Sequence, residues 1–283
     1  ADQSVFKDNV LAEARILRAN VYFDLIRYWG GSKTGFNQAG GVGVPLVLTP
    51  TLVEADAKPK ARATEAAVMG QVITDLDFAI GVSTFGNTNV AGRVGKDYAK
   101  ALRARVALYM GDYATAQNYA TELIGSSRYT LTAGADYKNI WALKNTKESL
   151  WEIQFEPTNS NSIAFFYYTT ATGGRNEIAT SSALNTAHEA GDLRQAINAT
   201  TTGGAATNLK TLKFTRVATG DDNVVMFRLS ELYLIRAEAR AQLGTDLVGA
   251  LADLNVVRTR AGLAANTTAT TTATLMTAIL KER

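Results

Sequence analysis

The sequence contains no cysteine and only one histidine, His188, in 283 residues. The absence of cysteine excludes disulfides, thiolate metal sites and cysteine nucleophiles within this chain. A Ser-His-Asp relay or a histidine-rich metal site would depend on His188. That residue lies in the polar segment Thr186–Asp192 (TAHEAGD), a setting that favours an ordinary surface histidine.

Common catalytic motifs are also missing. The sequence has no HExxH, GxSxG, GxxxxGK[ST] or GxGxxG motif. Asp75 and Asp77 are two residues apart on a predicted helix, so their side chains diverge, whereas the two carboxylates of a glycoside hydrolase must converge on the sugar. Asp221, Asp222 and Asn223 could bind calcium through oxygen ligands, but the pattern favours a solvated helix cap. We expect no enzyme activity, no cofactor and no metal site, and a carboxylate hydrolase is the least favoured alternative.

Charge and hydropathy exclude two further classes. The net charge is +3, from 29 basic and 26 acidic residues, and there is no dense run of lysine and arginine, so a nucleic-acid partner is not expected. No stretch reaches the roughly 18 apolar residues of a transmembrane helix, and no signal peptide is recognisable. A hydrophobic content of 46% is enough for one large domain or two small ones.

What the sequence has instead is a helix hairpin at 226–262. Leu229, Leu232 and Tyr233 recur at helical spacing over a first helix of about 226–243. Gly244 ends that helix, because glycine accepts the left-handed backbone of a helix stop, and a second helix starts near Asp246. The apolar positions of the second helix are Leu247, Ala250, Leu251, Leu254 and Val257. Two helices joined by so short a turn are expected to pack together.

The same pattern occurs earlier, at 98–124, where Gly111 separates two alanine-rich helical segments. Ala104 precedes Gly111 by seven residues, as Ala237 precedes Gly244. Small residues at these positions allow two helices to approach closely, which is typical of tetratricopeptide-like repeats.

The remaining segments predict three more helices and three strands. A helix over 2–30 carries Leu11, Ala14, Val21 and Tyr28 at helical spacing, and one over 64–80 has Thr64 as its N-cap. Strands are expected at 129–131, 150–155 and 211–217, and alternation puts Trp151 and Ile153 on one side of the second, opposite Glu152. A final helix begins near Leu275.

The fold class is therefore predicted as mainly α, with tetratricopeptide-like helix hairpins packed beside an irregular, loop-rich region with a few short strands. We expect one domain over 1–283. Its helical core covers about 5–30, 60–125 and 224–283, and its loop-rich side covers about 126–223.

Aromatic and amide side chains offer the best candidate for ligand chemistry. Sugar rings stack on aromatic rings, and their hydroxyl groups suit amides and charged groups, which binding loops often carry. The candidate ligand-binding residues are Trp29, Asn159, Asn161, Phe166, Tyr168, Arg175 and Asn176. The alternative is that 165–168 is a buried strand. Trp141 and Trp151 are expected in the core, and Trp29 is the best exception because the Gly30-Gly31 break leaves it at a helix end.

Six segments carry a resemblance to a known family. They are AEARILRANVYFDLIRYWGG at 12–31, GVPL at 43–46, GRVGKDYAKALRARVALYMGDYATAQNYA at 92–120, KNTKESLWEIQF at 144–155, FRLSELYLIRAEARAQLG at 227–244 and ALADLNVVRTRAGL at 250–263. Their content and order resemble the SusD/RagB family and span nearly the whole chain. They are scaffold motifs, and we expect their charged residues to pair between helices.

The resemblance implies a surface-exposed outer-membrane lipoprotein of Bacteroidetes-type bacteria. It implies a protein that binds glycans or other nutrients without cleaving them and forms a lid on a SusC-like TonB-dependent transporter. Family members are usually longer, with a lipid-bearing cysteine near the start, so we expect a domain incomplete at both ends and a lipid anchor outside this chain. Two alternatives stay open: capture of peptides instead of glycans, and a helical-repeat interaction scaffold with no small-ligand site.

Overall fold

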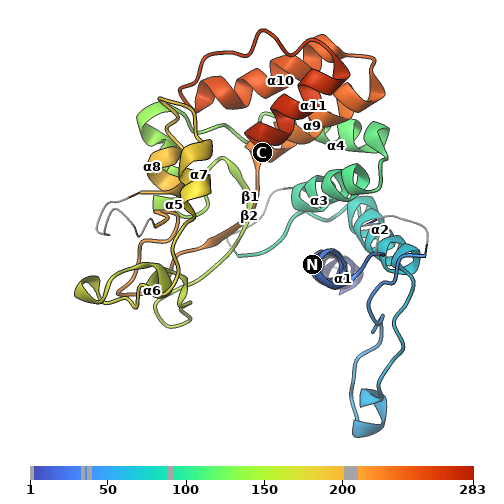
Figure 1. Ribbon diagram of the computed structural model, residues 1–283. Helices are drawn as coiled ribbons and strands as arrows, with labels where there is room; N and C mark the ends of the chain where they lie inside the picture. The colour runs from blue at the N-terminus through green and yellow to red at the C-terminus, as the bar shows by residue number, and fades with distance from the viewer. Residues whose placement is uncertain (1–2, 33–35, 37–39, 88–91, 201–209) are drawn as a thin grey trace. The chain divides into compact units, whose positions relative to one another are not determined.

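The computed structural model describes residues 3–32, 36, 40–87, 92–200 and 210–283 (Figure 1). The fold divides into two compact units. The first unit comprises Ala1–Asn89 and Arg93–Tyr119, and the second comprises Val90–Gly92 and Ala120–Arg283. Helices dominate the described residues, which contain two short strands, so the predicted fold class is confirmed.

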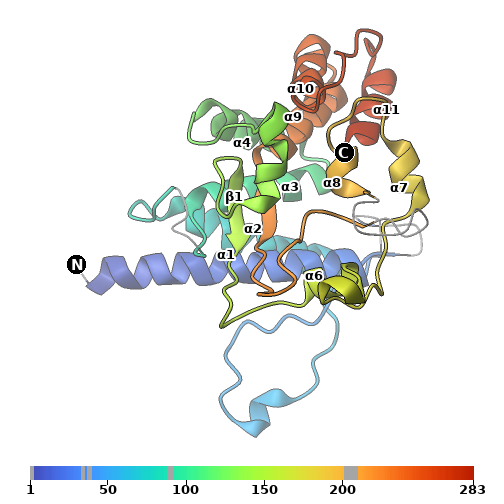
Figure 2. The same ribbon diagram turned by 90° about the vertical axis from the view of Figure 1, so that its left-hand side faces the viewer.

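The first unit is built on three helices. Helix α1 (Gln3–Trp29) packs against α2 (Glu65–Gly81), and α2 packs against α3 (Lys96–Tyr109). Thr64 caps α2 as predicted, accepting a hydrogen bond from the Ala67 amide at 3.1 Å. Figure 2 shows α1 as one long helix and the loop before α2 extending away from it, with the short helix η1 (Glu54–Ala57) at its tip.

The buried face of α1 is not the predicted one. The structure buries the row that contains Ala12, Ile16, Ala19 and Phe23, whereas Val21 and Tyr28 of the predicted row are 54% and 73% exposed. Because α1 carries apolar residues on both faces, spacing alone does not identify the face that packs.

An ion pair joins α1 to α2. Arg18 donates to both oxygens of the buried Asp75 at 2.7 and 2.6 Å. Asp77 points elsewhere and pairs with Arg103 of α3. The two aspartates therefore diverge as predicted, and each has a structural partner.

A turn at Gly111, with φ of 74°, separates α3 from α4 (Tyr113–Gly125), at the predicted position. The left-handed backbone there favours glycine. The Asp112 carboxylate accepts from the Thr115 amide at 3.1 Å and so caps α4. The predicted pair of helices and its break at Gly111 are confirmed, and α3 begins two residues before the predicted start.

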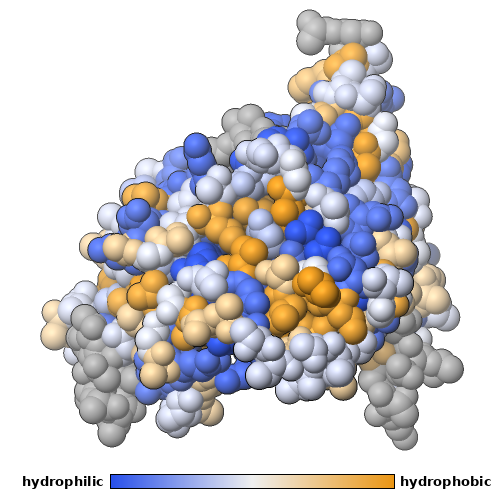
Figure 3. All heavy atoms as spheres, turned by 90° about the horizontal axis from the view of Figure 1, so that it is seen from above, coloured by the Kyte–Doolittle hydropathy of each residue, from blue (hydrophilic) through white to orange (hydrophobic). Residues whose placement is uncertain are grey.

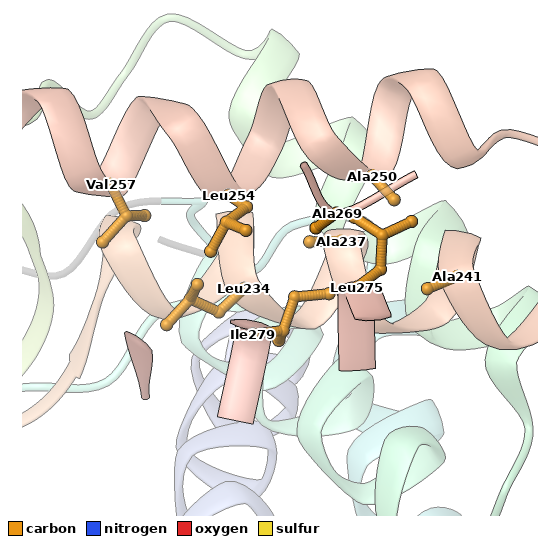
Figure 4. Close-up of a cluster of buried hydrophobic side chains, with 9 residues drawn as sticks. All are labelled: Leu234, Ala237, Ala241, Ala250, Leu254, Val257, Ala269, Leu275 and Ile279. Atoms are coloured by element: carbon orange, nitrogen blue, oxygen red, sulfur yellow. The ribbon is translucent and has the colours of Figure 1, made fainter. Parts of the chain in front are cut away.

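In the second unit, α9 (Leu229–Leu243) and α10 (Leu247–Arg260) form the predicted hairpin, and α11 (Thr272–Glu282) packs against both. Gly244 has φ of 69°, and Asp246 caps α10 by accepting from the Gly249 amide at 2.8 Å. Figure 4 shows the shared core, in which side chains from the three helices and from Ala269 converge. The buried residues of that core are Leu234, Ala237, Ala241, Ala250, Leu254, Val257, Ala269, Leu275 and Ile279.

Charged residues of these helices pair between elements, as the scaffold motifs predict. The buried Asp253 of α10 accepts from Arg236 and Arg240 of α9 at 2.7 to 2.8 Å. Glu282 of α11 pairs with Arg258 of α10 at 3.1 Å. Each carboxylate removed from water here keeps a cationic partner, the condition under which burial of a charge is tolerated.

The two strands are β1 (Ser149–Ile153) and β2 (Val224–Arg228), paired antiparallel. Strand β1 was predicted, but the structure buries Glu152 and leaves Ile153 37% exposed, because register shifts at Trp151 interrupt the alternation. Strand β2 was missed. The sequence reads as helix from Met226, yet pairing with β1, some 75 residues earlier, holds this stretch extended.

Short helices account for much of the loop-rich region. They are η2 (Gly134–Lys138), α5 (Asn139–Ala142), α6 (Ile163–Tyr167), η3 (Thr170–Thr172), α7 (Ser182–Ala187) and α8 (Gln195–Asn198). The strands predicted at 129–131 and 211–217 are absent, so those two predictions were wrong. Residues 221–223 lead into a strand, with Asp222 and Asn223 buried, and are not a solvated helix cap.

Candidate functional site

The aromatic run at 165–168 lies on α6 and its C-cap, and not on a buried strand. Its four rings are all half-buried, and Phe165 and Phe166 meet edge to face with their centroids 5.6 Å apart. Half-buried rings combine a fixed position with an accessible surface, which is the arrangement that a sugar face needs.

Asn161 anchors the start of α6. Its side-chain amide donates to the Asp222 carbonyl at 2.8 Å, and its Oδ1 accepts from the Ile163 amide at 2.9 Å. Its backbone amide donates to the Gly220 carbonyl at 2.7 Å. Gly220 has φ of 62°, and a Cβ atom there would lie 2.5 Å from the Asn161 carbonyl oxygen. Asn161 therefore positions the aromatic run.

A turn at Gly174 folds the chain back onto α6. A Cβ atom on Gly174 would lie 2.2 Å from the Tyr168 carbonyl oxygen, so only glycine fits. After the turn, the Arg175 amide donates to the Phe165 carbonyl at 2.8 Å and the Asn176 amide to the Tyr168 carbonyl at 2.7 Å. These bonds place Arg175 and Asn176 beside the aromatic run, with both residues exposed.

Tyr168 faces a lysine. The ammonium nitrogen of the buried Lys210 lies 3.9 Å from the centre of the Tyr168 ring, within cation–π range. Burial lowers the pKa of Lys210. Burial, with a smaller contribution from Asp222, raises the pKa of Tyr168. Lys210 therefore occupies one face of the Tyr168 ring.

A second aromatic group is centred on Trp141. Lys213, which follows Lys210 by three residues, lies beside the Trp141 ring. The Trp141 ring packs at 69° to Tyr137, with centroids 5.2 Å apart. The ammonium of Lys213 lies 5.4 Å from the Trp141 ring centre, and the guanidinium carbon of Arg228 lies 5.2 Å from it. Burial and the neighbouring Arg228 lower the pKa of Lys213.

Hydrogen bonds fix the segment 210–213 that carries both lysines. The Thr200 and Lys210 backbones exchange hydrogen bonds at 2.9 and 3.0 Å, and the Leu212 amide donates to the Ile197 carbonyl at 2.7 Å. Leu212 and Trp141 cover a small core of Tyr137, Ile140 and Ile197. Trp141 was predicted to lie in the core. It packs against this small core but is itself only half-buried.

A buried carboxylate, that of Glu148, contacts Arg228, one of the two cations beside Trp141. Glu148 is fully buried, and its two oxygens accept from Arg260 at 2.8 and 2.9 Å. Arg228 adds a single bond at 3.2 Å, and the Thr132 amide adds one at 2.8 Å. Glu148 therefore balances one positive charge while two guanidinium groups contact it.

The seven predicted ligand-binding residues fall into three groups. Asn161, Phe166, Tyr168, Arg175 and Asn176 converge on the α6 region. Asn159 is exposed and forms an isolated antiparallel β-bridge with Glu156. Trp29 ends α1 in the first unit, where it is 63% exposed and meets Tyr28 edge to face. Their binding role stays a prediction.

Sequence reasoning missed the cations at these rings. Lys213 lies in a segment that was predicted as a strand, and Arg228 in one predicted as a helix, whereas no element was predicted at Lys210. The only local signal was the pair of lysines three residues apart in the stretch 210–213.

Metal and membrane features are limited in the part of the chain that the structure describes. There, no three histidine, aspartate or glutamate side chains gather as a metal-ion site. His188 contacts the Leu184 carbonyl at 2.7 Å and the Asn198 amide at 3.1 Å, so its ring is held in place. None of the described helices has the length and apolarity needed to cross a membrane.

On the face seen in Figure 3, apolar side chains gather in patches between polar ones.

Comparison with known proteins yields one family. A model of the SusD family matches residues 144–283. SusD-like protein P38 of Formosa agariphila is 25% identical over 286 residues, which cover 83% of this chain and 53% of that protein. This chain therefore spans about half the length of that relative.

Solved structures agree with the sequence matches. A SusD superfamily protein of Bacteroides vulgatus superposes with a TM-score of 0.81 at 25% identity, covering 100% of this chain and 66% of that one. A laminarin binding SusD-like protein has a TM-score of 0.75 at 24% identity, covering 100% of this chain and 68% of that one. The fold is common to all of them.

Proposed function

This chain belongs to the SusD/RagB family, and from that premise we propose that it binds glycans at the bacterial outer-membrane surface without cleaving them. The observation that carries the proposal is the set of half-buried rings at 165–168, held between Asn161 and the Gly174 turn. The two units together act as one SusD-like domain.

Capture rests on two interactions. The free faces of Phe166 and Tyr168 stack on the C–H faces of sugar rings, while Arg175 and Asn176 supply hydrogen bonds to the hydroxyl groups. Bound ligand then passes to a SusC-like TonB-dependent transporter, on which this protein forms a lid. A lipid anchor outside this chain holds the protein at the membrane surface.

Two variants test the site. We expect Tyr168→Ala to weaken glycan binding about tenfold or more in calorimetry, because it removes a central aromatic contact. Phe6→Ala, at an aromatic residue of the first unit that is 66% exposed, is the matched control and should leave binding unchanged. A protein of the same fold binds laminarin, so laminarin oligosaccharides are the first neutral probe.

The non-catalytic part of the proposal has its own test. Incubation of pure protein with a polysaccharide panel should release no reducing ends. Release of reducing ends that tracks the purified protein would contradict it. Peptides are the alternative ligand at the same site, and the same calorimetric assay with a peptide library distinguishes them from glycans.

A second candidate is a helical-repeat interaction scaffold without a small-ligand site. The observation that favours it is the row of exposed apolar residues along α1, among them Leu17, Val21 and Tyr28 at 42%, 54% and 73% exposure. Glycan binding that Tyr168→Ala abolishes would reject this candidate.

A further inference from the structure

Positive charge exceeds negative charge around Trp141. Three cationic side chains gather there: Lys213 and Arg228 near the Trp141 ring, and Arg260 with its guanidinium carbon 5.1 Å from the Tyr137 ring centre. The carboxylate that contacts this group is Glu148, which both arginines share. The group thus holds three cations, and Glu148 contacts two of them.

Neighbouring charges do not correct this excess. Arg194, the other arginine close to Tyr137, is already paired with Asp192 at 2.8 Å and with Glu282 at 2.5 Å. Within the described residues, no carboxylate forms an ion pair with Lys213. Burial lowers the pKa of Lys213, and the like charge of Arg228 lowers it further, as expected for a half-buried cation beside a second cation.

A ligand can reach the two outer cations. The Arg228 side chain is 26% exposed, and Trp141 and Lys213 are both half-buried. Partial removal from water strengthens the interaction of each cation with an incoming anion relative to a fully hydrated surface charge. Glu148 and Arg260 lie deeper and hold the group in place.

We propose that Trp141, Lys213 and Arg228 form an anion subsite that recognises the carboxylate or sulfate group of an acidic oligosaccharide. This inference rests on the proposed glycan-binding function and specifies its ligand class. Arg228 and Lys213 bind the oxyanion, and the accessible part of the Trp141 ring packs on the sugar that carries it. Such charge-assisted hydrogen bonds are about twice as strong as neutral ones.

The test compares three probes by calorimetry with the full chain. The probes are laminarin oligosaccharides, which are neutral, polygalacturonate oligosaccharides, which carry carboxylates, and sulfated dextran oligosaccharides. We expect at least one acidic probe to bind, with an affinity that falls as salt rises. Lys213→Gln should weaken that binding about tenfold, and Lys213→Arg should retain it. Lys147→Gln, at an exposed lysine nearby, is the matched control and should change nothing.

Each outcome decides a different point. Binding of both acidic probes, or of one alone, supports the subsite and identifies its anion. Acidic binding that Lys213→Gln leaves unchanged, or that Lys147→Gln weakens equally, overturns the subsite. Binding of laminarin without either acidic probe also overturns it but leaves the proposed function intact. Binding of no carbohydrate by folded protein rejects both.

Discussion

Both carboxylate oxygens of Glu148, at the edge of β1, accept hydrogen bonds from Arg260 near the end of α10, at 2.8 and 2.9 Å across 112 residues of sequence. The contact links the two-stranded sheet to the hairpin of α9 and α10. Arg228, the last residue of β2, also contacts Glu148 and lies beside the half-buried Trp141 ring.

Loss of the Glu148 charge should destabilise the second unit strongly. We expect Glu148→Gln to lower the free energy of unfolding by roughly 3–5 kcal/mol, because it leaves Arg260 buried without a counter-charge. Urea denaturation measures the change. Glu156→Gln, at an exposed glutamate, should stay within about 0.5 kcal/mol. Equal effects of the two substitutions would contradict the assigned role of Glu148.

The turn at Gly174 should be intolerant of a side chain. Gly174→Ala puts a Cβ atom 2.2 Å from the Tyr168 carbonyl oxygen, so the backbone must move and the aromatic run with it. We expect glycan affinity to fall about tenfold or more by calorimetry. Gly70→Ala is the control, since nothing lies within 4 Å of its added Cβ atom. It should keep binding and gain up to about 1 kcal/mol of stability from better helix propensity. Unchanged binding by Gly174→Ala would separate this turn from the ligand site.

Acid should weaken the contact between α10 and Glu189. Hydrogen bonding from Arg258 lowers the pKa of Glu189 from 4.5 to about 2. Because the folded value lies below the unfolded one, the stabilisation is fully present above pH 4.5 and is lost as the pH falls through about 2. Unfolding free energies measured from pH 5 to pH 2 should therefore fall less steeply for Glu189→Gln than for the unaltered protein. Parallel curves would contradict the assignment.

The charge of Lys213 should lower the stability of the folded protein, although the proposed anion subsite uses it. Burial, then the charge of Arg228, lowers the pKa of Lys213 from 10.5, so holding the charged side chain costs the folded state free energy relative to the unfolded chain. Lys213→Met should therefore raise the midpoint of thermal unfolding at pH 7. The unfolded chain binds more protons between the lowered pKa and 10.5, so the native protein gains stability with rising pH and the advantage of Lys213→Met shrinks there. A lower midpoint for Lys213→Met at pH 7 would show that the charge is compensated.

The helix hairpin of α9 and α10 could be predicted because its signals are local. Gly244 marks a left-handed stop, and Asp246 caps the next helix within two residues. The packed face of α1 could not be predicted, since Ile16 on one side and Val21 on the other are equally apolar. The choice between them depends on α2, more than 30 residues further along the chain.

Strand β2 and the cations at Trp141 escaped sequence reasoning for the same reason. Val224–Arg228 becomes a strand only through pairing with β1. The position of Lys213 beside Trp141 depends on the hydrogen bond that the neighbouring Leu212 amide donates to the Ile197 carbonyl. No periodicity within either segment encodes these partners. The α6 region was predictable in content, because its aromatic and amide residues are adjacent in sequence, while its short helix was not.

Calorimetric binding of the full chain to a panel of neutral and acidic oligosaccharides tests the central claim most directly. The account predicts saturable binding of at least one oligosaccharide and its loss in Tyr168→Ala, while Phe6→Ala binds normally. Failure of folded protein to bind any oligosaccharide in the panel, or binding that Tyr168→Ala leaves intact, would contradict it.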